Sequence, residues 1–366
     1  MPGFATARAY LRQAHVVSTH WDRSFVGTLA RMVLSRIRYH RGPREYDTYR
    51  FARRPLREWR DYIDPAELLA RQTALSPAAF RYLEENKVAF AEHCSRFDLR
   101  TVPIIGVIAS AASNRSELSG AGVLRSGEEL QRLFAPHGAF DGFAKPLGAG
   151  QGYGAFAFRV EGPVVTSSHG AESCDAFVQH CANSPYAGDG YLLQPRVRPH
   201  PLLMPLMPGP GLGTVRVYTF VDRDGDVAMP LAHLKIPAAG SDTDNVHEGS
   251  VQGSLAVPVD MTTGRLGNAV GSTAGQPVVD VVMRHPETNV AFDGFQLPWW
   301  AEVRDLVTRG ARAFERLPAL GWDVAIAEDG PLLMETNWEF GAPDRIYDRG
   351  FAVEFRRLFP EVARSG

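Results

Sequence analysis

A hairpin near the C-terminus constrains the fold of this chain more than any other feature. Its two apolar strands lie in GWDVAIA and PLLMETN, and the polar turn EDG joins them, within residues 321–337. Such a pattern predicts an antiparallel sheet. The turn suits a three-residue loop with Gly330 in the left-handed conformation. In that register three pairs face each other: Ala327 and Pro331, Ala325 and Leu333, and Asp323 and Glu335.

The polar end of this hairpin predicts a cation site. Two carboxylates that face each other directly, Asp323 and Glu335, repel unless a cation lies between them. Side chains alternate along a strand, so Leu333, Glu335 and Asn337 should project to one side. Asp323, Glu335 and Asn337 together offer three hard oxygen ligands, which suit Mg²⁺ bound with substrate phosphates. A strand end that frays into solvent is the alternative.

The composition is that of a globular protein with a large core. The chain has 366 residues, of which 45% are hydrophobic, and its strand pairs alternate with helices, so we expect an α+β architecture. We place the domain boundaries at 1–86, 87–197 and 198–366.

No apolar run is long enough to span a bilayer and the first residues lack the apolar core of a secretory signal, so a cytoplasmic protein is expected. Three cysteines without Cys-x-x-Cys spacing indicate reduced thiols: Cys94, Cys174 and Cys181.

The first 60 residues are strongly basic, with 13 arginines, no lysine and four acidic residues. This arm could meet a membrane surface or another anionic polymer, or its arginines could pair with the acidic remainder of the chain. Within the arm, an amphipathic helix is predicted from apolar residues at helical spacing: Phe25, Leu29, Met32, Val33 and Ile37. Such a helix packs on the body of the protein or lies on a membrane. No nucleic-acid motif is present, so no nucleic-acid partner is expected, and the oligomeric state stays open.

Lysine is rare in this chain, because only three of the 39 basic residues are lysine: Lys87, Lys145 and Lys235. Sites that need a compact ammonium donor would explain their retention, and chance is the alternative. Lys145 precedes the glycine-rich run GAGQGYGA, residues 148–155. The following residues alternate like a strand and do not open a helix, which excludes a dinucleotide-binding turn. The run predicts a hairpin tip whose amides can close over a phosphate chain, or a mobile surface loop.

The order of these features resembles the ATP-grasp superfamily, and more narrowly its sugar-transfer-associated subfamily. The resemblance covers residues 80–345 and rests on the runs TVRVYTF, HLKI, DNVHEGSV and GWDVAIAEDGPLLMETN together with the three lysines. It implies an ATP-grasp fold with two α+β lobes that clasp ATP, preceded by a helical extension. It also implies ATP and Mg²⁺ as cofactors.

The resemblance implies a role for particular residues. ATP would contact Lys87, Lys145, Lys235, Gly150, Gln151, Gly152, Gln194, Arg196 and Val197, with the last three at the adenine hinge mainly through backbone groups. Asp323, Glu335 and Asn337 would hold Mg²⁺. Arg216, which shares a strand face with Tyr218 and Phe220, would steady an acyl phosphate together with Lys235, although a salt-bridged strand arginine is equally compatible with the sequence. Asn245 and His247 would contact substrate, or lie in a merely solvated loop.

The implied reaction is that of an ATP-dependent ligase. Mg-ATP would phosphorylate a small-molecule carboxylate, and an amine would attack the acyl phosphate to form an amide. Two alternatives keep the fold: a kinase that phosphorylates a hydroxyl, and a nucleotide-binding protein without turnover.

Overall fold

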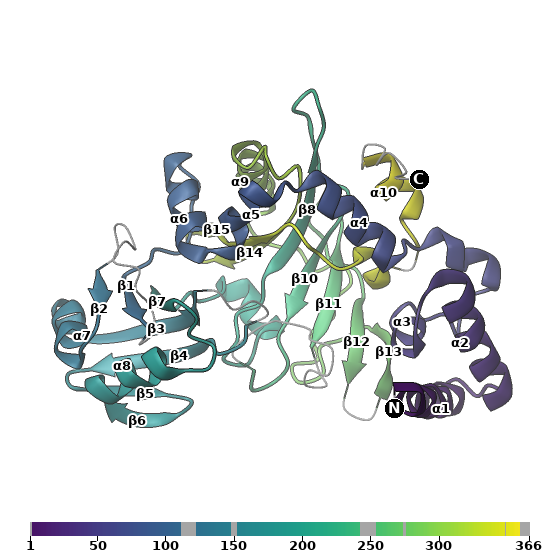
Figure 1. The fold of residues 1–366 in the computed structure, drawn as a ribbon, viewed down its shortest axis with the longest axis horizontal. Coiled ribbons are helices and arrows are strands. Elements are labelled where there is room, and N and C mark those ends of the chain that lie inside the picture. Colours follow the sequence, from purple (N-terminus) through teal and green to yellow (C-terminus); the bar gives the residue numbers. More distant parts are fainter. Residues whose placement is uncertain are drawn as a thin grey trace.

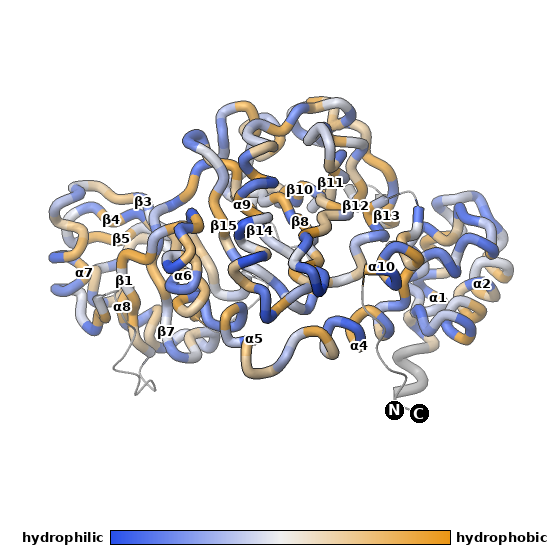
Figure 2. The backbone as a smooth tube through the Cα atoms, turned by 90° about the horizontal axis from the view of Figure 1, so that it is seen from above, coloured by the Kyte–Doolittle hydropathy of each residue, from blue (hydrophilic) through white to orange (hydrophobic). Residues whose placement is uncertain are grey.

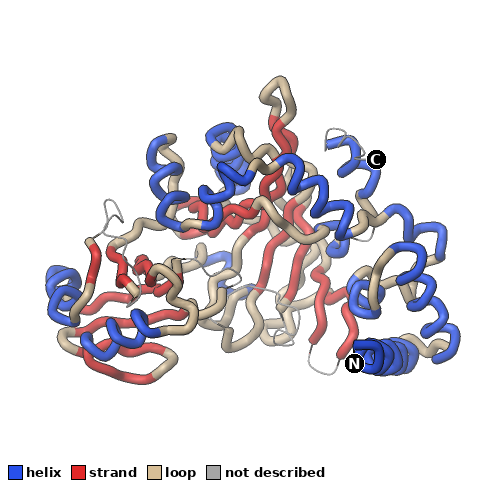
Figure 3. Tube along the Cα trace, in the orientation of Figure 1, coloured by secondary structure: helices blue, strands red, loops and turns tan. Residues whose placement is uncertain are grey.

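The computed structural model describes residues 2–110, 122–147, 152–241, 254–273, 276–347 and 349–358. It has an α+β architecture with two sheets side by side and a group of helices at the N-terminal end (Figures 1 and 3). Both sheets are antiparallel except for the parallel pair β1 and β2. Two residues expected in the phosphate loop, Gly150 and Gln151, lie outside the described residues, as do the substrate candidates Asn245 and His247. No helix within the described ranges is both long and apolar enough to cross a bilayer.

The N-terminal helices pack around a cluster of aromatic rings. They are α1 (Pro2–His20), α2 (Phe25–Tyr39), α3 (Pro43–Thr48), η1 (Leu56–Asp61) and α4 (Pro65–Leu75). Two more helices follow, α5 (Ala78–Glu85) and α6 (Lys87–Arg96), and they contribute Leu83 and Phe90 to a different core. Phe51 stacks on Trp59 with ring centroids 4.6 Å apart. The buried Arg41 donates to the carbonyls of Trp59 and Tyr62 and lies over the Phe51 ring. Part of the arginine excess therefore serves the core of this region.

The smaller sheet has the strand order β2-β1-β7-β3-β4-β5-β6. Its elements are β1 (Gly106–Ala109), β2 (Val123–Leu124), α7 (Gly127–Phe134), η2 (Ala135–His137), β3 (Ala139–Pro146), β4 (Phe156–Glu161), β5 (Val164–Ser167), β6 (Gly170–Ser173), α8 (Cys174–Asn183) and β7 (Gly190–Pro195). Ser126 and Glu129 form a capping box at the start of α7. The buried side chains of β4, Phe156, Phe158 and Val160, meet α7 and α8 in one core.

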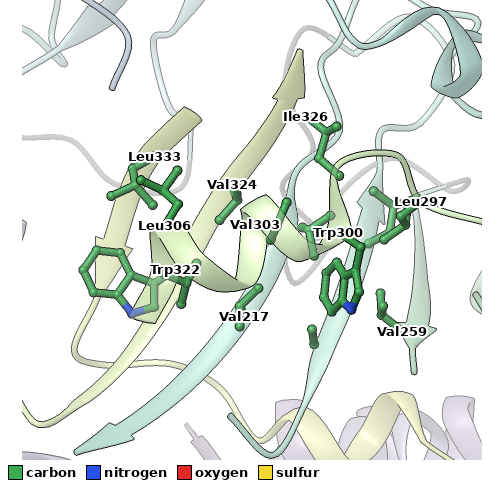
Figure 4. Close-up of a cluster of buried hydrophobic side chains, with 14 of the residues drawn as sticks. Val217, Val259, Leu297, Trp300, Val303, Leu306, Trp322, Val324, Ile326 and Leu333 are labelled. Carbon is green, nitrogen blue, oxygen red and sulfur yellow. The ribbon is translucent and has the colours of Figure 1, made fainter. Parts of the chain in front are cut away.

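The larger sheet has the order β13-β12-β11-β10-β8-β14-β15, with β9 paired to β8. Its elements are η3 (Pro201–Leu206), β8 (Val215–Val221), β9 (Val227–Ala228), β10 (Ala232–Ile236), β11 (Leu255–Val259), β12 (Ala269–Thr273), β13 (Gln276–Val282), α9 (Trp300–Ala313), β14 (Ala319–Ala327), β15 (Gly330–Asn337), η4 (Pro343–Ile346) and α10 (Ala352–Leu358). Helix α9 covers one face, where Val303 and Leu306 meet Trp322 (Figure 4). The opposite face of the central strands carries polar side chains and also Phe220, which packs in the core of the N-terminal helices.

Helix α6 contacts the cores of both sheets. Residues 87–96 were expected in the small lobe, and Val88 packs with Leu192 of the smaller sheet, whereas Phe90 joins the core of the larger sheet, where its ring lies 5.8 Å from that of Phe314. Helix α9 begins at Trp300, which enters the core, and Trp299 is its exposed N-cap residue. The boundaries at residues 86 and 197 stay predictions.

The C-terminal hairpin pairs Asp323 with Glu335, as predicted, but by a different route. Gly330 pairs with Ala327, so the turn has two residues and not three, and Ala325 faces Leu332. A β-bulge then leaves Met334 unpaired and brings Glu335 opposite Asp323. Leu333 pairs with Val324 in the apolar core, so the prediction that Leu333 projects with Glu335 is wrong. The bulge turns Glu335 to the opposite face.

The N-terminal helices meet the larger sheet at its edge strand, β13. Arg53 Nη1 lies 2.9 Å from Asp280 Oδ1. The largely buried Asp47 Oδ2 accepts hydrogen bonds from Gln13 Nε2 at 3.2 Å and from the Val279 N–H at 3.4 Å. Burial raises the pKa of Asp47 to about 7, and the nearby charge of Asp280 adds to this. The docking of helices on β13 therefore contains a carboxyl that titrates near neutral pH.

We predict that Asp47 makes the stability of the protein depend on pH. Its pKa is raised from 3.8 to about 7 by folding, so its contribution to stability is fully present below the unfolded value and is lost as the pH rises through the folded one. Between these two pKa values, the free energy of unfolding of the wild type should fall by up to about 1.4 kcal/mol per pH unit relative to that of Asp47→Asn. Urea unfolding at several pH values measures this, and parallel pH profiles for the two proteins would refute it. Asp22→Asn, at an exposed site in the same region, is the control.

Candidate active site

Four charged or titratable side chains form one row across the larger sheet, on the face opposite α9. The strand registers pair His233 of β10 with Arg216 of β8, Arg216 with Asp323 of β14, and Asp323 with Glu335 of β15. Paired residues point to the same face, as do residues two apart on a regular strand. Lys235, Tyr218 and Asn337 therefore lie on this face too. The row is the feature around which the site is built.

Asp323 is the centre of the row and is almost completely buried. It accepts two hydrogen bonds from Arg216, through Nε and through Nη2, and a third from Lys235 Nζ at 3.0 Å. Burial would raise the pKa of Asp323, but the charges of Arg216 and Lys235 outweigh it and hold that pKa well below its ordinary value. Arg216 is thus a salt-bridged strand arginine and, through the same bond, part of the site.

Glu335 has the opposite electrostatic character. Burial and the neighbouring charge of Asp323 raise its pKa, although Lys235 and Lys145 oppose the shift. Its carboxylate therefore carries negative charge that the surrounding protein compensates only in part. A ligand cation would supply the missing compensation.

The three residues predicted to hold Mg²⁺ share this face but differ in how well they fit a metal. Glu335 offers the undercompensated carboxylate. Asn337 donates through Nδ2 to the Gly321 carbonyl at 3.4 Å, which leaves its Oδ1 as an acceptor. Both oxygens of Asp323 are engaged by Arg216 and Lys235. Among the described residues no group of three or more His, Cys, Asp or Glu side chains surrounds a common point, so a metal here would also need the Asn337 amide and ligand oxygens.

The three lysines of the chain converge on Glu335 from three different elements. Lys235 lies in β10, Lys145 in β3, and Lys87 at the start of α6, where Asn86 caps the helix. The charges of Lys145 and Lys235 act on Glu335, and that of Glu335 acts on Lys87. Burial lowers the pKa of Lys87, and the neighbouring Lys145 adds to this. The three lysines that the sequence singled out by their rarity therefore lie around one carboxylate.

A narrow pocket joins the two sheets beside these lysines. Lys145 and Gln194 line it from the smaller sheet, Lys87 from α6, and Leu333 and Met334 from β15. The lining of the pocket combines apolar side chains with the ammonium groups of Lys87 and Lys145. That combination suits a ligand with a flat apolar part and an anionic tail.

The predicted hinge residues flank this pocket, but their polar groups are partly engaged. Gln194 Nε2 donates to the Val102 carbonyl at 3.0 Å. The Arg196 N–H donates to the Asp141 carbonyl at 3.0 Å and its guanidinium to the Pro210 carbonyl at 2.8 Å. The Arg196 amide is thus not available to a base. Val197 and Met334 both pack against the apolar cluster that contains Val102.

Gly152 begins the described part of the predicted phosphate lid. Its φ of +73° is one that glycine adopts at little cost. The Ala155 N–H donates to its carbonyl at 3.2 Å, which closes a tight turn. Tyr153 in this turn stacks on Tyr186, with ring centroids 6.0 Å apart. The lid is thus held at its C-terminal side by an aromatic contact.

His233 and Glu84 belong to this site, although the sequence did not single them out. His233 is buried, stacks on Tyr218, and its Nδ1 has no hydrogen-bond partner. Burial and the charges of Arg216 and Lys235 lower its pKa far below the ordinary value, so the ring is neutral. Burial and the charge of Glu335 raise the pKa of Glu84 to about 8. The alternation of side chains in AHLKI sets His233 on the same face as Lys235, so the sequence could have indicated this histidine as a site residue. No sequence pattern marks Glu84.

Comparison with known proteins gives a family for most of the chain. A family model described as sugar-transfer associated ATP-grasp matches residues 78–346. A comparison with curated protein sequences found no match.

Among solved structures, an ADP complex of N5-carboxyaminoimidazole ribonucleotide synthetase is 10% identical, with a TM-score of 0.37 over 69% of this chain and 44% of the other. Biotin carboxylase from Campylobacter jejuni is 11% identical, with a TM-score of 0.42 over 74% and 44%. D-alanyl-alanine synthetase A from Vibrio cholerae O1 is 11% identical, with a TM-score of 0.42 over 78% and 66%. The chain thus spans less than half the length of the first two, and likenesses this distant say nothing about its substrate.

Proposed function

This chain belongs to the sugar-transfer associated ATP-grasp family, and on that premise we propose that it is an ATP-dependent ligase. It would activate a carboxylate as an acyl phosphate and join it to an amine. The observation that carries the proposal is the convergence of all three lysines on the half-buried Glu335, beside the row that Arg216 and Asp323 complete. A triphosphate and a developing acyl phosphate are the anions that such a set of cations can neutralise.

ATP would lie between the two sheets. Its base would enter the pocket beside the apolar side chains of Leu333 and Met334, and its phosphates would extend toward Lys87 and Lys145. Glu335, Asn337 and Asp323 would hold Mg²⁺, which when bound would neutralise negative charge on the phosphates. ATP and Mg²⁺ are thus the cofactors of the proposed reaction.

Arg216 and Lys235 would act on the group being transferred. Both side chains now bind Asp323, and a phosphate group that enters beside Glu335 offers them a second anion. Their release from Asp323 would in turn free carboxylate oxygens for the metal. The fixed guanidinium of Arg216 would stabilise charge on the acyl phosphate and on the tetrahedral species that follows amine attack. Exclusion of water by the lid around Gly152 would protect the acyl phosphate from hydrolysis.

Hydroxylamine trapping tests this reaction. The protein is incubated with Mg-ATP, pooled carboxylates and hydroxylamine, and both ADP and hydroxamate are measured. A ligase of this type should form hydroxamate in step with ADP. ADP release with pooled hydroxyl compounds and no hydroxamate would identify a kinase instead. Specific ATP binding without ADP release from either pool would favour the nucleotide-binding alternative.

Replacing Lys145 should weaken ATP binding. Lys145→Met removes an ammonium group that lines the pocket while it keeps the length of the side chain. Loss of one charge-assisted hydrogen bond predicts an increase in the dissociation constant of ATP of about tenfold or more. Isothermal titration calorimetry measures this. Arg132→Met, which removes an exposed cation from α7 of the same lobe, should bind ATP as the wild type does; equal affinities for the two variants would refute the role of Lys145.

A further inference from the structure

Helix α2 turns its most apolar face toward solvent. Val26 and Ile37 are each 73% exposed and Val33 is 43% exposed. Ala30 is exposed between them, so the four residues form a stripe along one side of the helix. The side that packs on α1 and α3 includes the buried Thr28, Met32 and Ser35. The amphipathic helix predicted from the sequence exists, but its apolar stripe does not face the core.

The exposed stripe is part of a wider apolar surface. Phe25 and Leu34 of the same helix are 38% and 36% exposed, and Leu11 of the neighbouring α1 is half exposed. Single exposed apolar side chains are common on soluble proteins, whereas several on one short helix mark an interaction surface. Helices α1 and α2 lie at one end of the molecule, away from the site between the two sheets (Figure 2).

The same region is cationic at its surface. Nine of the 13 arginines in residues 1–60 are exposed: Arg8, Arg12, Arg23, Arg36, Arg38, Arg44, Arg53, Arg57 and Arg60. Of the four acidic residues in this segment, Asp22 is exposed, Glu45 and Glu58 are half-buried, and Asp47 is buried. At the C-terminal end of α2, Arg38 and Arg60 line a groove together with Arg356 of α10. Cations therefore border the apolar stripe.

We propose that α1 and α2 form a docking surface for an anionic lipid bilayer. Helix α2 would lie in the plane of the interface, with Val26, Val33 and Ile37 among the acyl chains and the surrounding arginines on lipid phosphates. Charge selects this partner over a second copy of the chain, because two such arginine-rich faces would repel each other. The apolar stripe selects it over nucleic acid, which offers phosphates but no continuous apolar surface to this helix.

Sedimentation with lipid vesicles tests this proposal with the intact chain. The wild type should bind vesicles that contain 30 mol% phosphatidylglycerol, bind phosphatidylcholine vesicles far more weakly, and be released by raised salt. The double variant Val26→Ser, Ile37→Ser should lose at least about tenfold in affinity. Its matched control is Met283→Ser, Val353→Ser, which removes two equally exposed apolar side chains, 69% and 70%, outside this surface. The control should bind as the wild type does.

Three results would overturn the proposal. One is vesicle binding that the stripe variant retains in full. Another is vesicle binding that the double variant Arg12→Gln, Arg38→Gln abolishes but the stripe variant does not. Charge alone would then explain the binding, and the partner would be an anionic polymer. The third is a dimer in light scattering that the stripe variant dissociates, in the absence of vesicle binding. Both stripe positions are exposed, so equal unfolding temperatures would show that the fold is unchanged.

Discussion

Replacing Glu335 by Gln should abolish turnover of Mg-ATP while the fold stays intact. The negative charge of the half-buried Glu335 is left undercompensated by its surroundings, since burial and Asp323 raise its pKa. The substitution keeps the shape of the side chain and removes this charge. Loss of a group that holds charge at the reacting phosphates predicts a fall in ADP release on the order of 10³-fold. The free energy of unfolding should not fall. Asp323 is the principal partner of the neighbouring cations, and Glu335 is not.

ADP release measured by a coupled assay and the urea unfolding midpoint together test this prediction. Glu328→Gln is the matched control, because Glu328 is exposed in the turn of the same hairpin. The control should retain full activity. Undiminished ADP release by Glu335→Gln would refute the assignment of Glu335 to the metal and phosphate site.

Replacing Asp323 by Asn should destabilise the protein strongly as well as inactivate it. Lys235 is buried on the larger sheet and Arg216 is largely so, with 14% of its side chain exposed, and Asp323 is the carboxylate to which both are hydrogen-bonded. Without its charge, these two cations would lack their main compensation. Breaking a buried ion pair in this way costs about 3–5 kcal/mol.

Chemical unfolding of the two carboxylate variants separates the roles of their residues. Asp323→Asn should unfold at a much lower urea concentration than the wild type, whereas Glu335→Gln should not. Replacing Arg216 by Met in the Asp323→Asn background should recover part of the loss, since one of the uncompensated cations is then absent. Equal destabilisation by the two single variants would contradict the distinction between them.

The hairpin shows how far the sequence can predict this site. A three-residue turn with regular pairing and a two-residue turn with one bulge both bring Asp323 opposite Glu335. The pairing was therefore predicted correctly from an incorrect turn. The turn EDG fits both loop lengths, and the bulge at Met334 depends on tertiary packing that no local pattern records. Its effect is to reverse the direction of Glu335 relative to Leu333.

The residues missed at the site share one property. His233 and Glu84 acquire their perturbed pKa values from burial and from charges on other elements. A lone histidine on a strand and a glutamate at a helix end have no spacing that distinguishes them from ordinary residues. The three lysines could be singled out only because the chain uses so few of them.

The helix α2 illustrates the same limit for packing. Its periodicity predicted an apolar stripe correctly, but periodicity does not say what covers the stripe. The packed side instead buries Thr28 and Ser35 beside Met32. Which face is covered depends on the aromatic cluster around Phe51 and Trp59, which fills the interior of this region without the stripe.

The most direct test of the proposed site is the effect of Mg²⁺ on ATP binding. Isothermal titration of ATP into the wild type and Glu335→Gln, each with and without Mg²⁺, gives four dissociation constants. Mg²⁺ should tighten binding to the wild type and leave binding to Glu335→Gln almost unchanged, because the variant lacks the carboxylate that would hold the metal. An undiminished gain from Mg²⁺ in Glu335→Gln would contradict the placement of the metal and of the triphosphate beside this residue.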